Sequence, residues 1–114
     1  MNLEEIKMLL QCQVLTPEAN LSVEVDTVLA SDGMSEILAV HHPGALMITG
    51  LTNILSVRTA IVADARAIVY IRGKQLNDKA LELARQKKIP VLTTRFGMFD
   101  VCGILREHGM KGAM

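Results

Sequence analysis

The chain has 114 residues, half of them hydrophobic and only 3% aromatic, and its 12 basic residues balance its 12 acidic ones. This length suits one domain with one core, and a neutral chain with few aromatic rings for base stacking is not expected to bind nucleic acid. No apolar run reaches the roughly 18 residues of a membrane span and no secretory signal opens the chain, so no membrane association is expected. Cys12 and Cys102 lack C-x-x-C spacing, which favours reduced thiols and a cytoplasmic protein.

The first thirty residues predict a helix and two strands. Asn2 and Glu5 have the spacing of a capping box, which starts a short helix. Residues 13–15 have the composition of a brief edge strand. Residues 21–30 alternate at first and then become continuously apolar, which predicts a strand that begins at an exposed edge and continues into the core.

A strand–helix–strand unit follows in the middle of the chain. Residues 45–49 and 67–71 are short apolar runs closed by Gly50 and Gly73, the pattern of strands buried on both faces. The segment between them predicts an amphipathic helix whose apolar face would consist of Ile54, Leu55, Val57, Ile61 and Val62. Two strands joined by a helix in this length should run parallel.

Two further helices are predicted beside this unit. Residues 34–40 form a helix that Ser31 or Asp32 would cap, and residues 78–88 form one that Asn77 would cap. The inner face of the second helix would consist of Ala80, Leu83 and Ala84.

The C-terminal quarter predicts a third strand at residues 89–93 and a last helix at residues 96–108. The buried face of that helix would include Phe99, Cys102 and Leu105, and residues 110–114 are expected to form a frayed tail. The fold class that follows is α/β: residues 1–114 form a single domain with a short, mostly parallel sheet flanked by helices.

Small and polar residues follow each predicted strand. Because the carboxyl ends of parallel strands meet at one edge of a sheet, where open α/β sheets bind ligands, these residues form a candidate site. The candidate ligand-binding residues are Ser31, Asp32, Thr49, Gly50, Asn53, Arg72, Gly73, Lys74, Thr93 and Thr94. Arg72, Lys74 and Arg95 bring positive charge, and the helix N-termini expected at Asn53 and beyond Thr94 bring amide donors. Both favour a small anionic ligand such as a phosphate or nucleotide. The alternative is that these residues serve only as the loops and caps that every strand–helix junction needs.

No familiar catalytic motif is present. The chain lacks G-x-x-x-x-G-K-[ST], G-x-G-x-x-G and G-x-S-x-G, so no catalytic residue or cofactor is predicted and enzymatic activity stays open. His41, His42 and His108 lack the spacing of a metal site. Asp32 and Asp64 could form a pair of general bases, although a helix cap and a helix terminator are the favoured roles.

Three stretches carry a resemblance to a known family. Residues 44–50, 67–73 and 89–94, together with Phe99 and the upstream residues 30–32, resemble the strand-end clusters of the DRTGG domain. The resemblance runs from about residue 3 to residue 109, although Arg72-Gly73 stands where many relatives have a Gly-Gly pair. It implies a compact α/β module that occurs within phosphotransacetylases and between the CBS domains of some regulated pyrophosphatases. The module is similar to the amino-terminal domain of HPr kinase/phosphorylase, and in none of these settings is it the catalytic part.

The first interpretation is a non-catalytic regulatory module of the DRTGG type, a homodimer that senses a phosphorylated metabolite or nucleotide at the strand ends. Its dimer surface could include the edge near Val23 and Val25. The second interpretation is a small phosphoryl- or acyl-transfer enzyme with Asp32 as base and with Arg72 and Lys74 as anion clamps. The third is a purely structural subunit that binds a protein partner.

Overall fold

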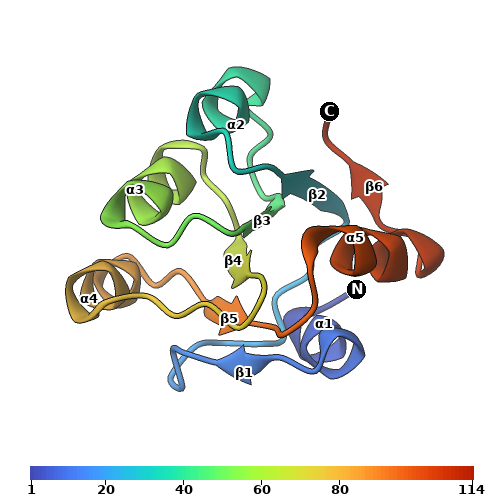
Figure 1. Ribbon diagram of the computed structural model, residues 1–114, viewed down its shortest axis with the longest axis horizontal. Helices are drawn as coiled ribbons and strands as arrows, with labels where there is room; N and C mark the ends of the chain where they lie inside the picture. Colours follow the sequence, from blue (N-terminus) through green and yellow to red (C-terminus); the bar gives the residue numbers. More distant parts are fainter.

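Six strands form one sheet in the order β1-β5-β4-β3-β2-β6 (Figure 1). The computed structural model describes residues 1–114, and its strands are β1 (Gln13–Val14), β2 (Thr27–Ala30), β3 (Leu46–Thr49), β4 (Ala67–Tyr70), β5 (Val91–Thr93) and β6 (Lys111–Gly112). All neighbouring strands pair in parallel except β1, which runs antiparallel to β5 at one edge. The predicted mostly parallel α/β sheet is confirmed.

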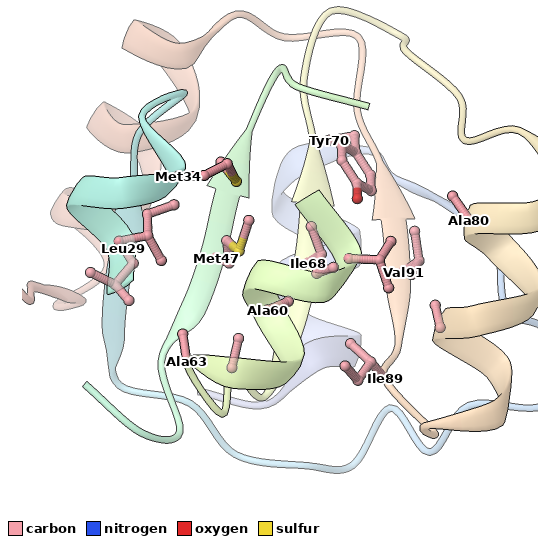
Figure 2. Packing of buried hydrophobic residues seen from close by; sticks show 14 of the residues in the cluster. Leu29, Met34, Met47, Ala60, Ala63, Ile68, Tyr70, Ala80, Ile89 and Val91 are labelled. Atoms are coloured by element: carbon pink, nitrogen blue, oxygen red, sulfur yellow. The ribbon is translucent and has the colours of Figure 1, made fainter. Parts of the chain in front are cut away.

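Five helices cover the sheet on both faces: α1 (Leu3–Leu10), α2 (Met34–Val40), α3 (Ile54–Val62), α4 (Asp78–Gln86) and α5 (Met98–Glu107). Helices α2, α3 and α4 lie side by side on one face, and α1 and α5 lie together on the other (Figure 1). Strand residues alternate between the two faces, so Met47 packs under the three-helix layer while Leu46 and Ile48 face the opposite layer (Figure 2). The sheet therefore separates two aliphatic cores.

The asparagine caps are where the sequence placed them. Asn2 and Glu5 form the predicted capping box of α1, and the side chains of Asn53 and Asn77 cap α3 and α4. The cap predicted for α2 is wrong, because its N-cap is Gly33 and no side chain caps it. The Ser31 hydroxyl accepts only from the amide of Gly33 itself, and the Asp32 carboxylate binds Thr49 and Gly50 instead of the first turn of α2.

The predicted inner face of α3 is partly wrong. Leu55 and Val62 are 50% and 67% exposed. The buried residues are Ser56, Val57, Thr59 and Ala60, which are mostly small. The Ser56 hydroxyl lies 2.7 Å from the hydroxyl of the buried Tyr70 on β4. The helix therefore packs on the sheet through a stripe of small residues, with its large aliphatic residues to either side.

The C-terminal prediction needs two corrections. Phe99 is 90% exposed, because α5 turns Val101 and Leu105 into the core instead. The tail is not frayed at Met110 to Gly112: Met110 is buried and Lys111–Gly112 forms β6, with the Lys111 amide donating to the Asp26 carbonyl.

The strand predicted over residues 21–30 is shorter than expected, since β2 begins at Thr27. The segment before it is held by backbone bonds to the start of the chain: the Leu3 amide donates to the Val23 carbonyl, and the Val25 amide to the Met1 carbonyl. Val25 is buried, so the edge that was expected to be open is covered. None of the helices has the length and apolar character needed to cross a bilayer.

Candidate functional site

Four parallel strands, β2 to β5, end at one edge of the sheet, which we call the carboxyl rim. The register aligns their ends, because Ala30 pairs with Ile48, and Tyr70 pairs with both Thr49 and Thr93. The last residues of these four strands and the segments that follow them contain all the candidate residues predicted from the sequence. The predicted gathering of strand-end residues at one rim is therefore what the fold produces.

Asp32 connects the ends of β2 and β3. Its Oδ1 accepts a hydrogen bond from the Gly50 amide at 2.7 Å and one from the Thr49 hydroxyl at 3.0 Å. The Gly50 amide is the main cause of a pKa lowered below the usual carboxyl value. Burial opposes it, and the Thr49 hydroxyl, Arg72 and Lys74 lower the pKa further. Asp32 is therefore a carboxylate at neutral pH.

The loop after β4 turns two cations back over β3. Arg72 and Gly73 both have left-handed backbone conformations, with φ of 56° and 68°. The Arg72 guanidinium lies against Gly50, where a Cβ would come within 2.8 Å of Nη2. The Lys74 ammonium donates to the Gly50 carbonyl at 2.8 Å. Only glycine leaves room for the guanidinium at this place.

These contacts define a group that we call the rim cluster: Asp32, Thr49, Gly50, Arg72 and Lys74. Three strands contribute to it, and Gly50 is its meeting point. The exposed Arg72 and the half-buried Lys74 lie close to the Asp32 carboxylate, so the cluster has groups that can hold an anion against its cations and a hydroxyl against its carboxylate.

Four further candidates, Ser31, Asn53, Thr93 and Thr94, use their side chains to bind the backbone. The Thr93 hydroxyl donates to the Lys74 carbonyl at 2.6 Å, and the Thr94 hydroxyl donates to the Leu10 carbonyl at 2.6 Å. The Ser31 hydroxyl accepts from the Gly33 amide at 2.9 Å, and Asn53 caps α3. The loop-and-cap alternative thus describes these residues.

A polar hollow of about 440 Å³ adjoins the loop after β4. Among the residues that line it are Gly73, Arg95 and three glutamines, Gln11, Gln13 and Gln75. Sequence reasoning missed the glutamines, because Gln11 and Gln13 reach the rim only through the antiparallel pairing of β1 with β5. No local pattern announces that long-range pairing.

Other polar residues singled out in the sequence lie apart. Asp64 has φ of 55° and follows α3 at the opposite edge of the sheet, where its carbonyl accepts from the Gly44 amide at 2.8 Å. It therefore cannot act together with Asp32. His41 and His42 are exposed at the end of α2, and no three His, Cys, Asp or Glu side chains gather closely enough to hold a metal ion.

Comparison with known proteins agrees with this architecture. Among solved structures, one from Clostridium perfringens is similar: the CBS and DRTGG domains of the regulatory region of a pyrophosphatase, complexed with the activator diadenosine tetraphosphate. The TM-score is 0.74 at 18% identity over 90% of this chain, which shows a shared fold, and the match spans 45% of the longer chain. No curated protein matches the sequence. Residues 5–108 match the DRTGG domain, and the chain belongs to the DRTGG domain family.

Proposed function

We propose that the chain is a regulatory, ligand-sensing domain that binds a phosphorylated small molecule, a nucleotide or a phosphorylated metabolite, at the rim cluster. The observation that carries this proposal is the placement of Arg72 and Lys74 over Gly50. The similar pyrophosphatase region binds a nucleotide activator, which supports the same class of ligand here.

The charges at the rim favour an anion. Arg72, Lys74 and Arg95 follow β4 and β5, while Asp32 is the carboxylate of the rim cluster. Guanidinium and ammonium groups form charge-assisted bonds with phosphate oxygens, and Arg72 is exposed and free to turn toward a ligand. A phosphate that draws Lys74 from the Gly50 carbonyl would loosen the contact between the two loops, which is a route from binding to a change of shape.

Asp32 fits recognition better than catalysis. Its two hydrogen bonds use Oδ1, so Oδ2 is able to accept a ligand hydroxyl such as that of a ribose. A general base works best with a pKa near the working pH, whereas the pKa of Asp32 is lowered. This observation favours the regulatory interpretation over the phosphoryl- or acyl-transfer enzyme.

The proposed setting is a cytoplasmic homodimer. Both cysteines are free thiols, as a reducing compartment requires. A small domain gains stability when a second subunit covers its exposed apolar side chains, and here these include Phe99. The alternative is that a different protein, rather than a second copy of this chain, is the partner. We propose no nucleic-acid or membrane partner.

A thermal-shift panel tests the proposal. The chain is melted with nucleotides, including ATP and diadenosine tetraphosphate, and with pyrophosphate and acetyl phosphate; a ligand at 100 times its Kd stabilises the fold by about 2.7 kcal/mol. We expect at least one compound to raise the Tm, and we expect Arg72→Asn to abolish the rise. Asparagine tolerates the left-handed conformation at residue 72, so the variant keeps the loop.

Arg66→Asn is the matched control, since Arg66 is also an exposed arginine but precedes β4 at the opposite edge. A panel without any shift would favour the purely structural subunit. An equal loss of the shift in both variants would remove the rim cluster as the site.

A further inference from the structure

The outer face of α5 carries an exposed aromatic ring beside a dent. Phe99 is 90% exposed, and Gly103 lies one turn further along, where an added Cβ would meet no atom within 4 Å. With 3.6 residues per turn, Phe99 and Gly103 both point away from the buried Val101 and Leu105. This helix lies at the surface next to β6 (Figure 1).

Two hollows flank this dent. An apolar groove of about 530 Å³ lies between α5 and the strands β2 and β6, and its lining includes Cys102, Arg106 and Lys111. On the other side is a smaller hollow of about 300 Å³, which we call the acidic hollow; it is lined by Phe96, Phe99, Asp100, Gly103, Ile104 and Glu107. One flank of α5 is therefore basic and the other is acidic.

We propose that a second copy of this chain docks on α5 with the two α5 helices parallel. A two-fold axis along α5 brings the basic flank of one copy against the acidic flank of the other. In that arrangement Phe99 of each copy lies level with Phe99 of the other copy and packs against its acidic hollow, and Arg106 lies nearly level with Glu107 of the second copy. An antiparallel pairing brings each flank against its own kind, so Asp100 and Glu107 would face a second acidic flank.

This inference rests on the homodimer of the proposed function and gives it a surface. The surface would consist of α5 together with the groove walls of β2 and β6, which line the same groove. The charges favour the parallel arrangement over the antiparallel one, because only the parallel arrangement brings opposite charges together.

Sedimentation velocity over a range of protein concentrations tests the surface. Phe99→Ala is expected to weaken self-association at least tenfold, because an aromatic anchor at the centre of an interface carries much of the binding energy. The matched control is Leu55→Ala, which removes an exposed apolar side chain from α3 on the opposite face of the sheet. This control is expected to associate like the parent chain.

The relative orientation is tested by charge reversal at low salt. Arg106→Glu and Glu107→Arg are each expected to weaken association at least threefold, and the double variant is expected to restore it, because neighbouring residues do not face each other within one helix. A parent chain that stays monomeric at all concentrations overturns the homodimer itself. A dimer that Phe99→Ala leaves intact overturns only this surface, and a double variant without rescue overturns the parallel arrangement.

Discussion

Gly50 shows how one residue without a side chain can organise a site. Its amide holds Asp32, its carbonyl holds Lys74, and its missing Cβ makes room for Arg72. We expect Gly50→Ala to fold with a stability within about 1 kcal/mol of the parent, since the atom in its way ends a flexible side chain. The same variant should weaken ligand binding as much as Arg72→Asn does, because the guanidinium is displaced. Urea unfolding and a ligand titration measure the two effects, and a variant with full ligand affinity would contradict the assigned role of Arg72.

Asp32 makes the rim cluster sensitive to acid. Because the folded-state pKa is lowered, its contribution to stability is present above the unfolded pKa near 3.8 and is lost as the pH falls through the folded value. Asp32→Asn should therefore cost about 1 kcal/mol above pH 5, a modest figure because the carboxylate is largely exposed. The difference between the two proteins should shrink as the pH falls below 3.8 and the folded-state carboxylate takes up its proton. Urea unfolding curves from pH 2.5 to 7 check this, and a constant difference across that range would show that charge is not the cause.

The contribution of Tyr70 to stability is lost as the pH rises, whereas that of Asp32 is lost as the pH falls. Burial raises the pKa of the Tyr70 hydroxyl from 10.0 to about 12, against a smaller lowering by the hydrogen bond with Ser56. Its contribution is complete below pH 10 and is lost as the pH rises through about 12, by roughly 2–3 kcal/mol. Tyr70→Phe removes this dependence and costs about 1 kcal/mol at pH 8. Burial also raises the pKa of Cys12. Because Cys12 is present in both the parent chain and Tyr70→Phe, it changes the free energy of unfolding of both equally and does not affect the difference between them.

Among the helices and strands, β6 is the one that the sequence did not predict. It has two residues, and its backbone bonds join the Lys111 amide to the Asp26 carbonyl and the Ala113 amide to the Val28 carbonyl. Amide hydrogen exchange should therefore alternate, with Lys111 and Ala113 at least tenfold slower than Gly112. Uniformly fast exchange over these residues would restore the frayed tail that the sequence led us to expect.

The helices show which features of an element are local. Asn2, Asn53 and Asn77 fixed three helix starts correctly, because a cap and its helix lie within a few residues of one another. The cap of α2 was wrong because Asp32 binds Thr49 and Gly50 from another strand. Which face of α3 or α5 is buried also depends on distant partners. Tyr70 selects the small stripe of α3, and an exposed Phe99 has no signature in a periodic pattern.

At the scale of the whole molecule, the strand topology determines which residues come together. Parallel pairing of β2 to β5 follows from short apolar strands joined by helices, and it brings the strand-end residues to one rim. The candidate site could therefore be located from sequence. The role of each residue at the rim could not be predicted from the sequence. The Thr93 and Thr94 hydroxyls bind backbone carbonyls, and the glutamine-lined hollow depends on the pairing of β1 with β5.

The central claim is that this rim binds a phosphorylated ligand, and amide NMR during a titration tests it most directly. Diadenosine tetraphosphate, ATP and pyrophosphate are added in turn to the labelled chain. We predict that at least one of them moves the amide signals of Gly50 and Gly73 in a saturable way, while Gly44 at the opposite edge stays in place. Saturable movement of Gly44 without Gly50, or no movement with any of the three, would contradict the account.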